Sequence, residues 1–373
     1  MRSGFRRLVF VSILVVASVL ILLVTHLIAF RVPAPASRVE PSPFTFPFRG
    51  VDGRGLGGGG GGGGDTVQQA FHAREKLQRT TEAEVSKASD AYVVPLRNSQ
   101  GNGSALEVTI PITGQLGNQM FQYASLLGIA EMNGGRKAYY GTASKIGRIF
   151  QATRLADHPR RSLRVVYEKD FAGYDPKFQS LPQENVVLMQ YLQSWKYFDF
   201  IRSTIQREFT FKPSISAPAA NLLKKHAPRI GNKTKIGVHV RRGDFLVAHH
   251  IRKGYHTAPA SYVRKAMDYM RQSHGDVIFV FVTDDPSWCR KEFQTTDHVI
   301  ADGAPAEVHL AVLALCDHVI MTVGTYGWWG AYLAGGDVIY YWDRAQCLHD
   351  PPLPVEIKRP QDFFLPSWVP LTG

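Results

Sequence analysis

The sequence predicts an α/β region built from two Rossmann-like halves that face a cleft. Strands and helices alternate from Lys235 onward, and an unbroken apolar run at 277–282 is typical of a strand buried on both faces. A glycine-containing crossover from strand to helix lies much earlier, at 113–119. We place the two halves at 105–230 and 231–373, and expect one transmembrane helix and a flexible stem before them.

The amino terminus contains a candidate membrane anchor. Residues 8–30 are an uncharged, mostly aliphatic run of 23 residues. At ~1.5 Å of rise per residue, such a helix crosses a ~30 Å hydrocarbon core. Three arginines precede the run and one follows it, which favours a cytosolic tail at 1–7 and a luminal carboxyl end. A cleaved signal peptide is the alternative, but the run is longer than a usual signal-peptide core.

Residues 31–104 are predicted to form the stem. They include five prolines between 33 and 47 and eight consecutive glycines at 57–64. A segment of this composition cannot bury enough surface to fold.

Charge and cysteine content argue against a nucleic-acid-binding protein and against a fold held together by several disulfides. The formal net charge is +12, yet no basic helix, zinc spacing or aromatic RNA-binding signature accompanies it, so nucleic acid is not expected as a partner. A phosphorylated substrate and an anionic membrane surface account for the charge. Cys289, Cys316 and Cys347 permit at most one intrachain disulfide, and the apolar helical surroundings of Cys316 favour a core position.

The expected first half opens with alternating apolar residues at 106–112, which predict a strand. Met120, Tyr123, Ala124 and Leu127 then recur at helical spacing. Asn118 and Gln119 fall where the helix begins, and a helix amino terminus accepts an anion or a sugar hydroxyl.

The expected second half is a β/α series. Helices are predicted around 263–270, 307–315 and 328–334, and strands at 235–240, 277–282, 298–301, 318–322 and 338–342. Asp285 before Pro286 fits a helix N-cap, whereas Asp284 is placed to contact a ligand. Trp328 and Trp329 are expected to pack the last of these helices.

The strand that begins at Lys235 ends in two adjacent arginines. Alternation places Ile236, Val238 and Val240 on one face and His239 and Arg241 on the other. Arg242 and Asp244 fall in the turn beyond the carboxyl end of the strand, where doubly wound sheets bind ligands. Guanidinium groups match phosphate oxygens in pairs, so the sequence predicts a diphosphate site, with a surface ion-paired turn as the alternative.

Three motifs in one order resemble the α-1,2-fucosyltransferase family. They are G-Q-L-G-N-Q-M-F-Q-Y-A at 114–124, K-I-G-V-H-V-R-R-G-D at 235–244 and M-T-V-G-T-Y-G-W-W-G-A-Y-L-A-G-G-D at 321–337. The resemblance covers about 106–369. It implies a GT-B-like fold and inverting transfer of L-fucose from GDP-β-L-fucose to the 2-hydroxyl of a terminal β-galactose.

The resemblance assigns roles to individual residues. Arg241, Arg242 and Asn118 are predicted to be catalytic, and donor binding is expected of His239, Arg241, Arg242, Asp244, Asp284, Thr325 and Gly327. Asp244 is expected to orient an arginine rather than act as a base, because neighbouring guanidinium groups lower a carboxyl pKa. No Asp-x-Asp motif is present, so the arginines are predicted to stabilise the leaving diphosphate without a metal or other cofactor.

Some features stay open at this level. His309 stands where the family usually has an acidic residue, and Glu307 is two residues earlier. The sequence identifies no carboxylate as the general base. Assembly as a homodimer through the anchor or stem is left open. The sequons at Asn102 and Asn232 predict glycosylation of a type II Golgi membrane protein.

Two alternatives remain from the sequence. One is a fucosyltransferase of another linkage or acceptor, and the other is a membrane-anchored module that binds glycans or nucleotides without turnover. An NAD-type oxidoreductase would need a G-x-G-x-x-G motif between a strand and a helix, with an acidic residue ~20 positions later. Residues 105–373, where strands and helices are predicted, contain no such motif.

Overall fold

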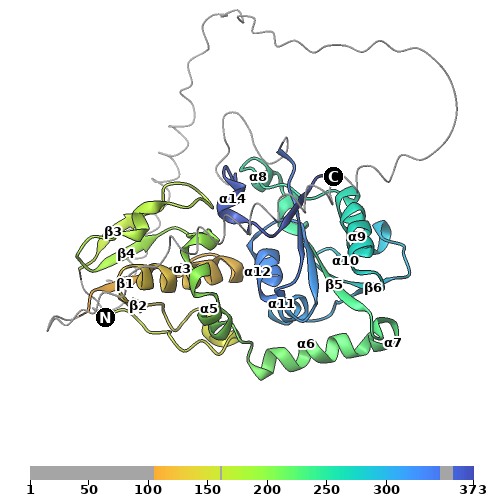
Figure 1. The fold of residues 1–373 in the computed structure, drawn as a ribbon, viewed down its shortest axis with the longest axis horizontal. Coiled ribbons are helices and arrows are strands. Elements are labelled where there is room, and N and C mark those ends of the chain that lie inside the picture. The colour runs from red at the N-terminus through yellow and green to blue at the C-terminus, as the bar shows by residue number, and fades with distance from the viewer. Residues whose placement is uncertain (1–104, 160–161, 345–355) are drawn as a thin grey trace, which may run out of the picture. The chain divides into compact units, whose positions relative to one another are not determined.

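The computed structural model describes residues 105–159, 162–344 and 356–373, which form an α/β protein with two parallel sheets (Figure 1). The expected anchor at 8–30, the stem at 31–104 and the sequon at Asn102 lie outside the described residues. Within the described part of the chain, no helix is both long and apolar enough to span a membrane.

The first sheet has four strands in the order β2-β1-β4-β3. Their bounds are β1 Glu107–Thr109, β2 Lys137–Tyr139, β3 Arg164–Tyr167 and β4 Val186–Met189. The strand predicted at 106–112 is confirmed, but pairing stops before Pro111, which has no backbone N–H to donate. The other three strands were not predicted, because each is only three or four residues long.

Helix α3 (Leu116–Met132) follows β1 and carries the predicted apolar residues. It is buried on nearly every side rather than on one face, since the first sheet, α12 and the short helices around 195–201 all contact it. Gly128 permits the closest approach, because a Cβ there would lie 1.9 Å from the carbonyl oxygen of Tyr197. The first half also contains α4 Lys145–Ile149, η1 Pro176–Gln179, η2 Trp195–Tyr197, η3 Asp199–Ile201 and α5 Arg202–Glu208.

The second sheet has six parallel strands in the order β10-β9-β8-β5-β6-β7. Counted from β5, this is the 3-2-1-4-5-6 order of the Rossmann fold. The bounds are β5 Thr234–Val240, β6 Val277–Thr283, β7 His298–Ile300, β8 His318–Met321, β9 Val338–Tyr341 and β10 Val369–Leu371. Strands β5 to β9 confirm the five predicted ones.

Helices cover both faces of the second sheet. Buried residues of α9 (Ala260–His274) and α10 (Pro286–Glu292) pack against Ile236, Val238 and Val240 of β5. Helices α6 (Pro213–Lys225) and α11 (Ala306–Ala314) pack on the opposite face, against Val280 and Val282. The remaining helices are α7 Ala227–Ile230, η4 Gly243–Leu246, α8 Ala248–Ile251, α12 Thr325–Ala334 and α14 Pro360–Phe363.

Local predictions in this half are confirmed as well. The carboxylate of Asp285 accepts the Trp288 amide at 3.0 Å, so it caps α10, which begins at Pro286. Cys289 and Cys316 are buried free thiols, and Cys347 lies outside the described residues. Burial raises the pKa of Cys289 to about 11 and that of Cys316 to about 12, which makes both thiols chemically inert near neutral pH.

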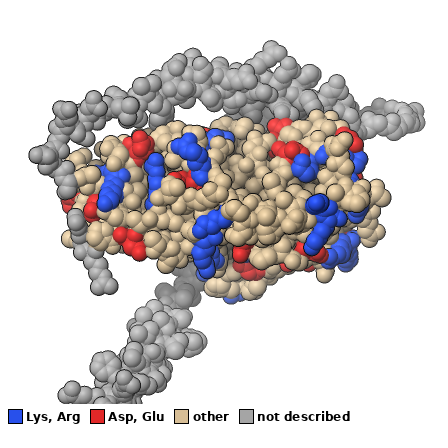
Figure 2. Space-filling view, turned by 90° about the horizontal axis from the view of Figure 1, so that it is seen from below, with Lys and Arg blue, Asp and Glu red and all other residues tan. Residues whose placement is uncertain are grey.

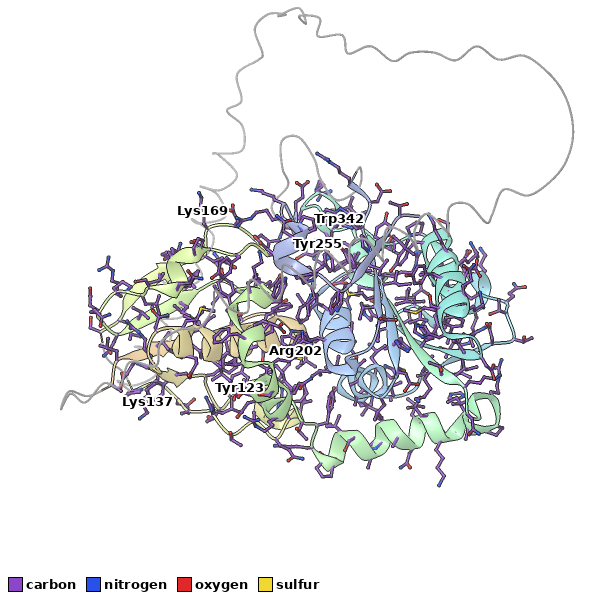
Figure 3. All side chains as sticks on the ribbon, in the orientation of Figure 1. Tyr123, Lys137, Lys169, Arg202, Tyr255 and Trp342 are labelled. Carbon is purple, nitrogen blue, oxygen red and sulfur yellow. The ribbon has the colours of Figure 1, made fainter. Side chains whose placement is uncertain are left out.

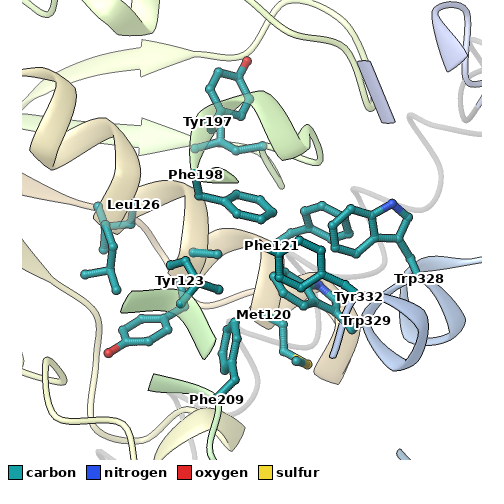
Figure 4. Close-up of a cluster of buried hydrophobic side chains, with 14 of the residues drawn as sticks. Met120, Phe121, Tyr123, Leu126, Tyr197, Phe198, Phe209, Trp328, Trp329 and Tyr332 are labelled. Atoms are coloured by element: carbon teal, nitrogen blue, oxygen red, sulfur yellow. The ribbon is translucent and has the colours of Figure 1, made fainter. Parts of the chain in front are cut away.

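An aromatic cluster joins α3 to α12 (Figure 4). The ring of Phe121 lies 4.6 Å from that of Trp328 and 5.1 Å from that of Trp329, and both tryptophans are fully buried. The Trp329 indole also donates a hydrogen bond to the carbonyl of Gly117 at 3.1 Å. The predicted packing role of the two tryptophans is confirmed, and it fixes the loop that begins α3 against the loop that begins α12.

The carboxyl-terminal segment returns to the first sheet. Asp362 of α14 is 4% exposed, and its carboxylate accepts the Tyr174 amide at 3.0 Å and the Lys196 ammonium at 2.7 Å. Ser194 donates to the Asp362 carbonyl at 2.6 Å. Four apolar residues at 363–368 then enter the same core cluster as Val108 of β1.

Candidate active site

The ligand-binding edges of the two sheets line the same cavity. In a doubly wound sheet, the ligand crevice lies where the strand order reverses. That point falls between β5 and β8 in the second sheet and between β1 and β4 in the first. Loops after all four strands line a cavity of about 610 Å³, which lies within the size range of small-molecule sites.

Arg241 supplies fixed positive charge to this cavity. Its backbone amide donates to Thr322 Oγ1 at 3.0 Å, which links the loops after β5 and β8. Its guanidinium contacts Asp244 at 2.6 Å and Asp284 at 3.4 Å. The orienting role predicted for Asp244 therefore matches its contact, and a guanidinium with five N–H donors keeps others for a phosphate.

Arg242 and Asp284 take up positions beside the cavity rather than in its lining. The guanidinium of Arg242 lies 4.1 Å from the centre of the Trp288 ring and pairs with Asp285 at 3.2 Å. Asp284 accepts the Arg242 backbone amide at 2.8 Å. The structure thus separates the two arginines, with Arg241 in the cavity wall and Arg242 bracing the turn behind it.

His239 lines the cavity from the face of β5 predicted by alternation. It is 4% exposed, and its Nδ1 has no hydrogen-bond partner among the described residues. Gly327 lies against the ring, since a Cβ there would be 2.2 Å from Nδ1. Burial, with a smaller contribution from the charge of Arg241, lowers the pKa of His239 to about 3. The ring is therefore neutral and offers one donor and one acceptor nitrogen.

Buried neutral His239 predicts a loss of stability in mild acid. Its pKa falls from 6.5 to about 3 on folding, so between those values the unfolded chain binds more protons than the folded one. The free energy of unfolding should thus fall as pH drops below 6.5, by up to about 1.4 kcal/mol per pH unit. Urea unfolding at pH 7.5, 6.5 and 5.5 should give a shallower pH slope for His239→Gln. His226→Gln serves as the control, and equal slopes in all three proteins would contradict the prediction.

Asn118 connects the two walls of the cavity. Its Oδ1 accepts hydrogen bonds from Thr325 Oγ1 at 2.9 Å and from Gln193 Nε2 at 3.0 Å. Thr325 begins α12 and Gln193 follows β4, so one amide oxygen joins the loops of both sheets. Thr325, of which donor binding was expected, lines the cavity, and its hydroxyl donates to Asn118.

The loop that carries Gln193 holds two residues in a disfavoured backbone conformation. Gln190 has φ 89° and Leu192 has φ 52°, and non-glycine residues with positive φ each cost on the order of 1–3 kcal/mol. Gln122 donates to the Gln190 carbonyl at 3.2 Å, and Ser125 donates to the Leu192 carbonyl at 2.8 Å. Such conformations persist where the surroundings fix them, and they cluster at ligand sites.

Several cavity residues escaped sequence prediction. They include the aromatic residues Phe171, Tyr191, Tyr255 and Trp342, the last two labelled in Figure 3, and the carboxylate of Glu356. The run at 186–189 before Tyr191 was the available signal, since it is apolar and ends in polar residues. From α11 the cavity is lined by Ala306, while Glu307 and His309 lie outside the lining.

Potential metal ligands in the described part of the chain gather elsewhere. His274, His318 and Asp337 offer ligand atoms within 4.8 Å of one another, at the edge of the second sheet where β8 and β9 begin. The Asp337 amide donates to His318 Nδ1 at 2.9 Å, so the neutral imidazole carries its proton on Nε2. That arrangement does not suit a three-ligand metal site.

Charges on the face shown in Figure 2 are mixed. Lysines and arginines alternate with aspartates and glutamates over this face, and they do not form a continuous basic track. That nucleic acid is not the partner stays a prediction from the sequence.

Sequence comparison identifies the family. The sequence model of Glycosyl transferase family 11 matches residues 67–372. The chain belongs to this family. Galactoside alpha-(1,2)-fucosyltransferase 2 of Bos taurus is 33% identical over 321 residues, which cover 82% of this chain and 91% of that protein. The Pongo pygmaeus protein of the same name is 35% identical over 272 residues, which cover 70% and 78%.

Galactoside alpha-(1,2)-fucosyltransferase 1 of Rattus norvegicus is 36% identical over 291 residues, which cover 70% of this chain and 72% of that protein. Among solved structures, the fucosyltransferase NodZ from Bradyrhizobium covers 61% of this chain and 93% of its own, with 16% identity and a TM-score of 0.42. The relatives of family 11 confirm the resemblance inferred from the three motifs and the predicted enzyme class, a fucosyltransferase.

Proposed function

We propose that the protein transfers L-fucose from GDP-β-L-fucose to the 2-hydroxyl of a terminal β-galactose, with inversion and without a metal. The observation that carries the proposal is the convergence of Arg241, neutral His239 and Asn118 on one cavity between the switch points of two parallel sheets. Family membership and the names of the relatives support the donor and the linkage. The two-sheet arrangement also supports the GT-B-like fold that the resemblance implies.

The proposed chemistry divides between the two walls of the cavity. The bond between fucose C1 and the β-phosphate oxygen breaks, and its electron pair leaves with GDP. A bond from galactose O2 to C1 forms on the opposite face of the sugar, and the O2 proton passes to the leaving diphosphate or to water. Arg241 is positioned to stabilise the growing negative charge on the diphosphate, and preorganised charge of this kind commonly lowers a barrier by several kcal/mol.

The test is direct. Full-length protein in detergent, incubated with GDP-fucose and a β-galactoside such as lactose, is expected to release GDP and form a fucosylated product. Mass and linkage analysis should find fucose on galactose O2. A product of another linkage would favour the alternative fucosyltransferase, and binding of GDP without turnover would favour the non-catalytic module.

Activity is expected to survive removal of divalent metals. Arg241 provides the charge that a metal ion supplies in other glycosyltransferases, and it cannot be deprotonated near neutral pH. GDP release should be equal within error before and after dialysis against excess EDTA. Loss of activity that Mn²⁺ restores would contradict metal independence.

We also propose a single-pass type II orientation in the Golgi membrane, with homodimerisation through the anchor or stem left open. Asn232 lies in an exposed turn just before β5, and we expect glycosylation there and at Asn102. A glycosidase should increase the gel mobility of the parent but not of the Asn102→Gln/Asn232→Gln variant. If protease added to sealed vesicles digests an unglycosylated carboxyl-terminal region, the orientation is the reverse of the one proposed.

A further inference from the structure

Gln193 has a buried side-chain amide of which only the nitrogen is hydrogen-bonded to the described residues. It is 2% exposed and lines the cavity. Its Nε2 donates to Asn118 at 3.0 Å, whereas its Oε1 accepts no hydrogen bond from the described residues. The oxygen is not among the fully buried unpaired atoms of the described residues, so it is reached from the cavity, where a ligand hydroxyl can donate to it.

The same contacts determine what Asn118 presents to the cavity. Its oxygen already accepts two hydrogen bonds, from Gln193 and Thr325, and an amide oxygen has two lone pairs. Its Nδ2 group makes no hydrogen bond within the described chain. Asn118 Nδ2 and Gln193 Oε1 thus form a donor and an acceptor on adjoining side chains, here called the amide pair.

The wall that holds the amide pair is nearly uncharged. The first half contributes amides, apolar groups and the aromatic side chains of Phe171 and Tyr191, with Lys145 as its one charged residue in the described lining. Lys145 is itself hydrogen-bonded to Gln115. The opposite wall carries Arg241 and Asp244. A neutral polyhydroxylated ligand therefore suits the first wall, and a diphosphate suits the second.

The backbone holds Gln193 in a fixed position. Glu168 accepts the Leu192 amide at 3.1 Å, and Ser125 bonds the carbonyl of the same residue. Leu192 and Gln190 keep their positive φ values under these restraints. A loop fixed in this way presents one amide orientation instead of adapting to many ligands.

We propose that the amide pair recognises hydroxyl groups of the acceptor sugar, and that Gln193 determines acceptor specificity. A sugar hydroxyl donates one hydrogen bond and accepts others, so neighbouring hydroxyls complement an N–H donor beside a C=O acceptor. A site built to bond a hydroxyl strongly disfavours an analogue that lacks it, because its buried polar atoms are then left unpaired. This inference rests on the proposed function.

The test compares Gln193→Glu and Gln193→Met with the parent in the full chain. Acceptors are methyl β-galactoside and its 3-, 4- and 6-deoxy analogues. The parent should lose kcat/KM with at least one analogue, roughly tenfold or more. Gln193→Met lacks the accepting oxygen, so it should lose a similar factor with the intact acceptor, mainly through KM, and should no longer distinguish that analogue from it. Gln193→Glu keeps an accepting oxygen but cannot donate to Asn118, so it should bind the acceptor less tightly while still distinguishing the analogue.

Thermal unfolding with GDP separates this role from a structural one. The shift in Tm caused by GDP should be unchanged in both variants, because the diphosphate wall is intact. Gln206→Glu, the same change at an exposed position, should behave as the parent. A Gln193→Met variant that discriminates as the parent does, or loss of the GDP shift in both variants, would overturn the proposal. If the parent protein fucosylates no β-galactoside, the proposed function is contradicted instead.

Discussion

Arg241→Lys is expected to lower kcat by roughly two to three orders of magnitude, as loss of one preorganised donor to a developing anion does elsewhere. The charge is kept, but an ammonium cannot contact Asp244, Asp284 and a phosphate in the fixed geometry of a guanidinium. GDP release at saturating GDP-fucose and galactoside measures the effect.

Arg207→Lys provides a matched control for this substitution. Arg207 lies on α5, donates to Thr204 at 3.0 Å and is exposed. The control should keep the activity of the parent, and both variants should retain its Tm. Parental turnover in Arg241→Lys would exclude the guanidinium from the chemical step.

Gly117→Ala is expected to reduce both activity and stability strongly. A Cβ at position 117 would lie 2.6 Å from Thr325 Oγ1 and 2.7 Å from the Tyr326 backbone nitrogen. Backbone atoms cannot rotate away as the end of a side chain can, so the loops beginning α3 and α12 must separate. The hydrogen bond from Thr325 to Asn118 should then be lost, with at least a roughly tenfold fall in kcat/KM.

A second helical glycine separates this clash from the general effect of adding a methyl group. At Gly147 in α4, the new Cβ would meet the end of the Leu155 side chain at 2.7 Å but no backbone atom closer than 3.8 Å. Gly147→Ala should keep activity close to that of the parent. If Gly117→Ala matches Gly147→Ala in kcat/KM and Tm, the close approach of the two loops is not required.

The sequence predicts best where periodicity and burial agree. The alternation in β5 placed His239 and Arg241 on the cavity side, and the apolar run of β6 identified a strand buried on both faces. The backbone conformation of Gln190 and Leu192 could not be predicted from the sequence. Their positive φ depends on hydrogen bonds from Gln122 and Ser125, which are more than 60 residues away in the chain, and neither residue type signals that conformation.

Arg242 shows a different limit of sequence reasoning. Adjacent residues after a strand point in different directions. The sequence predicts that both arginines bind the diphosphate, but the turn directs their side chains to different places. Whether the second guanidinium faces ligand or protein depends on Asp285 and Trp288. The motif specified the ligand-binding edge of the sheet, and packing specified which side chain faces the cavity.

The return of α14 to the first sheet bears on how the chain is made. During synthesis the first half leaves the ribosome well before residues 359–368 exist, and domains generally begin to fold as they emerge. The polar groups that bond Asp362 and the apolar core that contains Phe363 and Trp368 stay incomplete until these late residues have been translated. The first sheet must therefore remain soluble while its core is incomplete, and a stop codon before residue 359 would harm the half of the protein that was translated first.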